Sequence, residues 1–346
     1  MHLLLSAFIL LTSVAVVGQA QAQTPFYQGK TITIVVGTKA GDAYDLYPRM
    51  LAEFMPKYIP GNPNIIIQNM PGAASMIAAN HVFNVVKPDG LTLGAIYPAL
   101  YFEQLTKKPQ VKFDWTKFGW IGSPVKSNHL LYMRSDAPYK SMDDIRNAKT
   151  PPKCGASGVT STGNYLPKLM EDTLGTKFDI VLGYQAGQDV DLAVERGELV
   201  CRAFTITAYF AREPFISWRK RGFVNTLMQT GAKRDPRLKD APTIYELMDR
   251  YKTDAAGRNL GKLILAAGEF GRPLVTPPGF PADRLKIMRD AFDKAVSDPA
   301  LLAAAEKRRL EMDPTSGVEM EALAKEVIAA TPEVVQRVEK LLGGKN

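Results

Sequence analysis

The chain has 346 residues and a formal charge of +8, with two cysteines and three histidines. This length is enough for two domains of ordinary size. The basic residues are too scattered for a nucleic-acid-binding surface, and so few histidines and cysteines leave no cluster with metal-ligand spacing. We therefore expect no nucleic-acid partner, no metal and no cofactor. The positive balance suits anionic ligands or an anionic membrane surface.

The N-terminal segment resembles a secretory signal. Residues 3–18 are apolar and uncharged, and Ala20-Gln21-Ala22 follows as a small-x-small cleavage site. The apolar run is short for a membrane span. We expect residues 1–22 to be removed, which leaves a secreted, soluble chain from Gln23 onward. The alternative is a single anchoring helix.

Residues 29–54 predict a strand, a loop and a helix in that order. Residues 31–36 are β-branched and apolar, which is typical of a buried strand. Residues 46–54 carry apolar side chains at helical spacing. Such a loop, at the carboxyl end of a buried strand and before a helix, is where α/β proteins bind ligands, although every βα unit has one. The candidate ligand residues in this loop are Gly41, Asp42, Ala43, Tyr44 and Asp45.

The next residues repeat this pattern. A strand is expected at 64–68, a helix at 76–86 and a third strand at 91–96. Two βα units followed by a strand predict a parallel, doubly wound sheet. The candidate ligand residues of the second loop are Gly72, Ala73, Ala74 and Ser75.

A second α/β unit is expected from residue 124 to residue 230. Its strands are predicted at 130–133, 153–156, 178–182, 199–204 and 223–228. Hydroxyl side chains gather before a helix at 165–174, where they either donate hydrogen bonds to a ligand or only cap the helix. The candidate residues here are Ser157, Thr160, Ser161 and Thr162, with Thr205 after a strand and Tyr184, which either walls the site or simply packs.

The last part of the chain is predicted to be mostly helical. We expect helices from 242 and over 282–296, a strand at 263–267 and a helical tail from 299.

The two cysteines lie on predicted strands of the second unit. A crossover helix between Cys154 and Cys201 suggests neighbouring parallel strands, roughly 4.8 Å apart. That spacing suits a disulfide when both side chains point to one face. The alternative is two buried free thiols.

Enzyme signatures are missing from the sequence. It contains no Gly-x-Ser-x-Gly elbow, no phosphate loop and no dinucleotide fingerprint. We found no nucleophile paired with a base, so the sequence favours a binding protein over an enzyme.

Five motifs taken together resemble one family. They are Tyr27-x-Gly-Lys-x-Ile-x-Ile-Val-Val, Gly41…Asp45…Arg49, Asn69-x-Pro-Gly-Ala, Pro88-Asp-Gly-x-Thr-Leu and Pro242-Thr-Ile-x-Glu. In their order and spacing they resemble the Bug family, the periplasmic solute receptors of tripartite tricarboxylate transporters. The resemblance covers nearly the whole chain after residue 22.

The resemblance implies a fold and a function. The fold is a two-lobed α/β periplasmic-binding fold of type II-like form, with two doubly wound sheets and a hinge of two crossovers. Lobe 1 would comprise residues 23–123 and 231–346, and lobe 2 residues 124–230. A monomeric periplasmic receptor would bind a carboxylate-bearing organic acid between the lobes and deliver it to membrane permease subunits. The alternatives are a ligand sensor or, on the same scaffold, an enzyme.

The first loop departs from the family pattern. Asp42 and Ala43 replace glycines, and Tyr44 replaces a small threonine. Tyr44 would narrow the pocket or stack on the ligand, which favours an aromatic or apolar acid. Asp45 either caps the following helix or faces the ligand. Negative charge on Asp42 and Asp45 argues against a ligand with several carboxylates, unless Lys39 or another cation offsets it.

Overall fold

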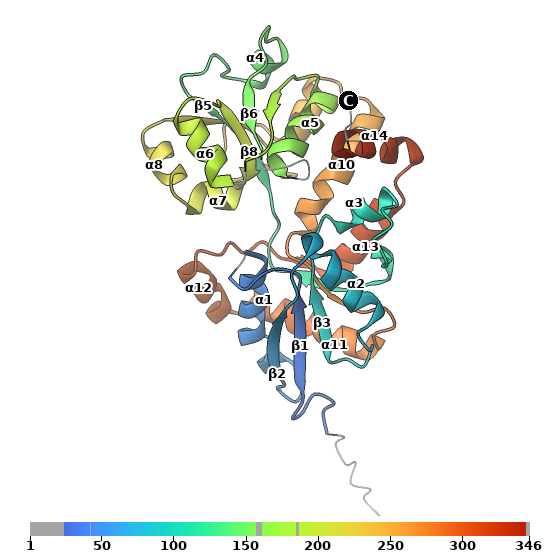
Figure 1. Cartoon of the computed structure of the whole chain (residues 1–346). Coiled ribbons are helices and arrows are strands. Elements are labelled where there is room, and N and C mark those ends of the chain that lie inside the picture. Colours follow the sequence, from blue (N-terminus) through green and yellow to red (C-terminus); the bar gives the residue numbers. More distant parts are fainter. Residues whose placement is uncertain (1–23, 42, 157–160, 185–186, 344–346) are drawn as a thin grey trace, which may run out of the picture.

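The computed structural model describes residues 24–41, 43–156, 161–184 and 187–343, arranged as two lobes stacked one above the other (Figure 1). Each lobe is built around its own β-sheet, and helices cover both faces. We call the six-stranded sheet with its helices lobe 1, and the five-stranded sheet with its helices lobe 2. This two-lobed α/β fold confirms the predicted fold class. The predicted signal segment lies outside the described residues.

The sheet of lobe 1 combines the first strands of the chain with strands that come much later. Strands β1, β2 and β3 are parallel, as predicted, whereas β10 is antiparallel to both β3 and β4. The order in space is β11-β4-β10-β3-β1-β2. The strands are β1 (Thr31–Val36), β2 (Asn64–Asn69), β3 (Thr92–Ala95), β4 (Gly119–Ser123), β10 (Leu274–Thr276) and β11 (Thr315–Ser316).

Side chains alternate along the strands, so the two faces of this sheet pack into two separate hydrophobic cores. Ile34 and Ile121 pack with side chains of α1 and α11 on one face. Val35 and Trp120 pack with side chains of α2 and α13 on the other. The helices of this lobe are α1 (Ala43–Phe54), α2 (Met76–Asn84), α3 (Leu100–Leu105), α11 (Ala282–Val296), α12 (Pro299–Lys307) and α13 (Gly317–Ile328).

Lobe 2 has the strand order β7-β6-β8-β5-β9. Strand β6 runs parallel to β7 and β8, and β5 is antiparallel to β8 and β9. The strands are β5 (His129–Arg134), β6 (Lys153–Gly155), β7 (Asp179–Val181), β8 (Cys201–Thr205) and β9 (Val224–Gln229). The helices are α4 (Met142–Arg146), α5 (Thr162–Leu174), α6 (Gly187–Glu195), α7 (Ile206–Ala211) and α8 (Phe215–Lys220).

The two cysteines are direct neighbours in this sheet. Cys154 on β6 is in register with Cys201 on β8, and the two strands are parallel. Their sulfur atoms are bonded, with the Cα atoms 4.5 Å apart. The bond ties together two central strands whose residues are 47 positions apart in the chain.

Three helices that come after β9 pack on lobe 2. They are α9 (Ile244–Arg250), α10 (Ala255–Phe270) and, at the end of the described chain, α14 (Pro332–Gly343). All three contact α5 of lobe 2, although they fall in the segment 231–346 that we expected in lobe 1. The predicted strand at 263–267 is wrong, because Leu260, Leu263, Ile264 and Ala267 lie on the buried side of α10.

Candidate functional site: the cleft between the lobes

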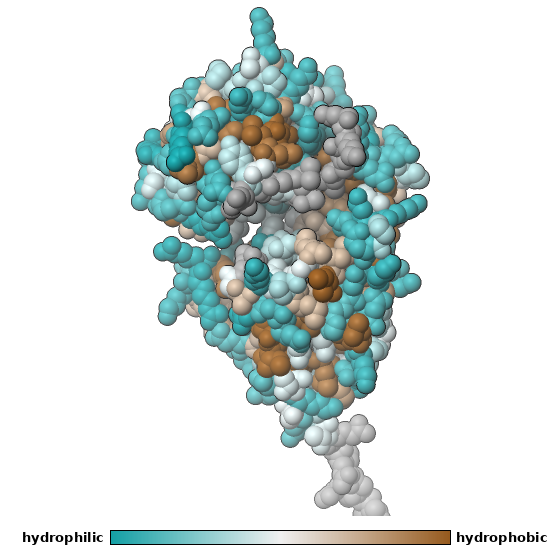
Figure 2. Space-filling model, viewed as in Figure 1, coloured by the Kyte–Doolittle hydropathy of each residue, from teal (hydrophilic) through white to brown (hydrophobic). Residues whose placement is uncertain are grey.

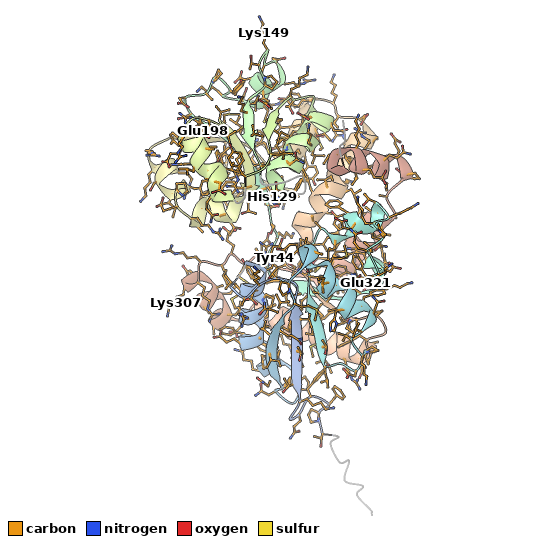
Figure 3. All side chains as sticks on the ribbon, in the orientation of Figure 1. Tyr44, His129, Lys149, Glu198, Lys307 and Glu321 are labelled. Atoms are coloured by element: carbon orange, nitrogen blue, oxygen red, sulfur yellow. A yellow bond between two sulfur atoms is a disulfide. The ribbon has the colours of Figure 1, made fainter. Side chains whose placement is uncertain are left out.

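The lobes enclose a cavity that receives side chains from both of them. Figure 3 shows Tyr44 of lobe 1 and His129 of lobe 2 on the facing sides of the gap. We call this cavity of about 330 Å³ the apolar hollow. It is lined by Tyr44, Ala74, Tyr97, Pro98, Ala99, Leu100, Phe102, Glu103, Ser127, His129, Thr162, Tyr165, Thr205, Ala267 and Arg272.

Arg272 is the cation of this hollow, and the chain fixes its position closely. Its backbone N–H donates to Ser123 Oγ at 2.8 Å, and its Nη1 donates to Ser127 Oγ at 2.8 Å. The preceding Gly271 has φ +57°, and a Cβ there would lie 1.8 Å from the backbone oxygen of Val125. Residues 124–128 form the crossover from β4 of lobe 1 to β5 of lobe 2. Only glycine therefore allows helix α10 to end so close to this crossover and turn Arg272 into the cleft.

The guanidinium of Arg272 keeps an unused donor. Its Nε is buried and has no hydrogen-bond partner among the described residues. Leaving a buried donor unsatisfied costs about 1–3 kcal/mol. The carbon of the guanidinium lies 3.8 Å from the centre of the Tyr44 ring, which is within the range of a cation–π contact. A ligand carboxylate is the group that would satisfy such a cation best.

Aromatic rings form the lobe 1 side of the hollow. The rings of Tyr44 and Tyr97 pack with their centres 4.3 Å apart. Tyr97 is held by its backbone N–H, which donates to Ser75 Oγ at 3.2 Å. The two rings are inclined by 42° to each other and form an aromatic wall beside Arg272.

Lobe 2 contributes groups that remain neutral. Burial, with the nearby positive charge of Arg272 as a second cause, lowers the pKa of His129 to about 4. Burial raises the pKa of Tyr165 to about 12. The Tyr165 hydroxyl lies 3.5 Å from His129 Nε2, and Thr162 Oγ1 donates to it at 3.3 Å. Near neutral pH the charged groups lining the hollow are therefore Arg272 and Glu103.

The carboxylate of Asp45 makes its hydrogen bonds within lobe 1. Its carboxylate is fully buried and accepts hydrogen bonds from the Gly41 N–H at 2.7 Å, Arg49 Nε at 2.7 Å and Asn69 Nδ2 at 2.8 Å. Burial alone would raise the pKa of Asp45, but these hydrogen bonds outweigh it and the pKa lies below its ordinary value. Asp45 thus ties the first loop to the end of β2 and does not line the hollow.

The second loop has an unusual backbone. Ala73, Ala74 and Ser75 have φ values of 44°, 50° and 72°, in the left-handed region that favours glycine. Ser75 is buried directly against Gly37, where an added Cβ would lie 1.8 Å from Ser75 Oγ. The loop follows this strained path while Ala74 lines the apolar hollow.

The predicted site residues fall into several groups. Tyr44, Ala74, Thr162 and Thr205 line the apolar hollow. Ser161 lines an adjoining cavity, which also includes Thr162 and Thr205. The remaining predicted residues lie elsewhere. Asp45 and Ser75 support the loops, Gly41, Ala43, Gly72 and Ala73 lie in the loops or at the start of α1, Tyr184 packs on the core of lobe 2, and Asp42, Ser157 and Thr160 lie outside the described residues.

Sequence reasoning missed Arg272, Ser127, His129, Tyr97 and Tyr165. Ser127 and Arg272 lie near the crossovers, far from any loop of the βα type. The pattern Gly271-Arg272-Pro273, a glycine stop before a strand, was the available signal.

The described residues offer neither a metal-binding cluster nor a membrane-spanning helix. No cluster of three or more His, Cys, Asp or Glu side chains there could hold a metal ion. Among the same residues, no helix has the length and apolar character needed to cross a membrane.

Comparison with known proteins identifies the family. The sequence profile described as "Tripartite tricarboxylate transporter family receptor" matches residues 48–339. The chain belongs to this family. Its receptors are periplasmic solute-binding proteins, which confirms the resemblance seen in the motifs.

Relatives and solved structures agree with this assignment. A Cupriavidus necator protein, "UPF0065 protein in gbd 5'region", is 27% identical over 285 residues, 81% of this chain and 79% of that protein. A ligand-free TctC solute-binding protein from Polaromonas has a TM-score of 0.72 at 20% identity, covering 91% of this chain and 100% of that one.

Two structural neighbours from Rhodopseudomonas palustris contain ligands. MatC with bound malate has a TM-score of 0.58 at 19% identity, covering 89% of this chain and 99% of that one. A protein with adipate has a TM-score of 0.60 at 20% identity, covering 90% and 97%. At these identities the likeness establishes the shared fold.

Proposed function

We propose that this receptor binds an organic acid in the apolar hollow, with a carboxylate on Arg272, and delivers it to the permease of a tripartite transporter. The observation that carries the proposal is the guanidinium of Arg272. It stands where the lobes meet, is held by Ser127, and keeps a buried Nε–H without a partner among the described residues.

The surroundings of Arg272 support a carboxylate with an apolar body. Tyr44 and Tyr97 form an aromatic wall next to the cation, and Leu100 and Phe102 extend the apolar lining. Because His129 is neutral near pH 7, Arg272 is the positive charge that a carboxylate would meet in this hollow. Malate and adipate, the ligands of two structural neighbours, are both carboxylic acids.

Contacts from both lobes would couple binding to closure. Thr162, Tyr165 and Thr205 belong to lobe 2, whereas Tyr44 and Ala74 belong to lobe 1. A ligand that touches both sets binds the closed arrangement better than the open one, and so shifts the population toward it. A closed, loaded receptor is the form that a permease would recognise.

A thermal-shift screen of carboxylic acids, followed by calorimetry, tests this proposal. A ligand at 100 times its Kd should stabilise the protein by about 2.7 kcal/mol. Arg272→Gln should lower the affinity for the best acid tenfold or more, because a hydrogen bond to a charged group contributes about 1.5–3 kcal/mol. Arg196→Gln, a change at an exposed arginine of lobe 2, is the control.

The outcomes separate a receptor from an enzyme as well. Unchanged affinity in Arg272→Gln would place the acid elsewhere and contradict the proposed site. After long incubation with the protein, mass analysis should recover the bound acid unaltered. A product that accumulates in proportion to the protein would contradict the receptor function.

A further inference from the structure

A second cavity opens from the same cleft, between α7 of lobe 2 and the end of α12 of lobe 1. Figure 1 shows these two helices facing each other across the gap, and Figure 2 shows the surface hollowed there between hydrophilic side chains. We call this cavity of about 230 Å³ the basic hollow. It is lined by Leu46, Tyr47, Val125, Lys126, Ser127, Thr205, Thr207, Ala208, Ala211, Arg212, Arg272, Arg308, Arg309 and Leu310.

The lining of the basic hollow is positively charged. It contains four arginines and a lysine, and no Asp or Glu. Lys126 pairs with Glu269 at 3.4 Å, and Arg308 pairs with Glu53 at 2.7 Å. Within the described part of the chain, Arg212, Arg272 and Arg309 have no carboxylate partner. A hollow lined by charges of one sign concentrates counter-ions.

The position of Arg309 is maintained against a local preference. Its φ is 57°, directly after the end of α12, where chains usually place glycine. A non-glycine residue in this conformation costs about 1–2 kcal/mol. Strain of this kind gathers at functional sites.

The unpaired arginines come from opposite sides of the cleft. Arg212 follows α7 in lobe 2, Arg309 follows α12 in lobe 1, and Arg272 lies beside the crossover. Their mutual repulsion opposes closure of the lobes. An anion that contacts both sides replaces this repulsion with attraction, so it favours the closed form.

We propose that the basic hollow is an oxyanion-binding site that bridges the lobes through Arg212, Arg272 and Arg309. Guanidinium groups bind carboxylate and phosphate through paired N–H donors. The oxyanion is either the second carboxylate of the bound acid, which rests on the proposed function, or a free phosphate, which does not. Arg272 lines both hollows. An acid whose first carboxylate binds Arg272 could therefore extend into the apolar hollow or the basic hollow.

Three probes at constant ionic strength test the site: inorganic phosphate, hexanoate and adipate. Hexanoate and adipate share a six-carbon chain and differ in the second carboxylate. Arg212→Gln and Arg309→Gln each remove one charge, and Arg196→Gln is the control away from the cleft. We expect each of the first two variants to lower the affinity for phosphate, or the preference for adipate over hexanoate, five- to tenfold.

The two sources of the oxyanion give different results. If the second carboxylate occupies the site, the parent prefers adipate, phosphate competes with adipate, and Arg212→Gln removes the preference. If free phosphate occupies the site, phosphate binds alongside hexanoate. The affinity for phosphate then falls in both Arg212→Gln and Arg309→Gln. Phosphate binding without any acid binding supports this site and contradicts the proposed function. If neither phosphate affinity nor adipate preference changes in either variant, the inference is wrong and the proposed function stands.

Discussion

The apolar hollow and the basic hollow share Arg272, Ser127 and Thr205 but differ in almost everything else that lines them. Around the apolar hollow, His129 and Tyr165 of lobe 2 are neutral, and aromatic rings supply the wall. The lining of the basic hollow holds four arginines and a lysine, of which Arg308 and Lys126 pair with carboxylates outside the lining. One cation thus stands between a surface suited to the body of an acid and a surface suited to a second negative group.

The difference shows how a receptor can separate affinity from selectivity. On the proposed function, the apolar hollow would bind any acid whose body fits against Tyr44 and Tyr97. The basic hollow would add binding free energy only for a ligand that carries a second negative group. Changes confined to one hollow should therefore leave the other intact.

The largest effect is expected when Asp45 is replaced, because its carboxylate holds the loop that precedes α1. Asp45→Ala leaves the Gly41 N–H and Asn69 Nδ2 without their acceptor and should lower the free energy of unfolding by about 3–5 kcal/mol. Urea unfolding measures this. Asp290→Ala, which breaks an exposed pair with Lys286, should cost less than about 1 kcal/mol. Equal effects of the two changes would contradict the assigned role.

The second effect is a loss of folding stability at acidic pH, which we attribute to His129. Its pKa of about 4 lies below the ordinary 6.5, so the unfolded chain binds the extra proton between these values. The contribution of His129 to the free energy of unfolding therefore falls as the pH drops from about 6.5 to 4, by about 3 kcal/mol in total. Unfolding midpoints across this range should decline less steeply in His129→Gln. Parallel curves for the parent and the variant would refute the prediction.

A smaller effect is expected at the aromatic wall. Tyr44→Ala removes an apolar ring that lines the hollow beside Arg272 and should lower affinity for the best acid about five- to tenfold, because apolar contact with a ligand contributes about 25 cal/mol for each Å² removed from water. Tyr44→Phe keeps the ring and should stay within about twofold of the parent. Calorimetry decides between them. If phosphate binding also fell in Tyr44→Ala, the two hollows would not be separable.

The smallest effect has the opposite sign. Ala74→Gly relieves a left-handed conformation at φ 50° and should stabilise the protein by about 0.5–1 kcal/mol, after the added flexibility of the unfolded chain is counted. Ala78→Gly, within α2, is the matched control and should destabilise it. A thermal scan shows both. Destabilisation by Ala74→Gly would mean that the loop is not strained.

The sequence predicted the local units well because their signals are local. The strand–loop–helix units of β1–α1 and β2–α2 follow from β-branched runs and helical spacing within about 25 residues. Residues 263–267 were assigned wrongly because a short apolar run fits a strand and a buried helix equally well.

The candidate site was harder to predict because distant segments build it. Tyr44 could be placed near the ligand from its loop alone. Arg272 could not, because its role depends on Ser127, which lies 145 positions away. Arg212 stands alone and Arg309 ends the run Lys307-Arg308-Arg309. Both patterns are those of an ordinary solvated surface.

The strand order of lobe 1 also has a consequence for the order in which the chain folds. Strand β4 joins β3 only through β10, which follows about 150 residues later and after all of lobe 2. A chain made from its N-terminus can therefore complete the sheet of lobe 2 while the sheet of lobe 1 is still in two pieces. Until β10 arrives, an edge of β3 is unpaired and open to aggregation. Pulse-labelling hydrogen exchange should show protection of β5, β6 and β8 before β4.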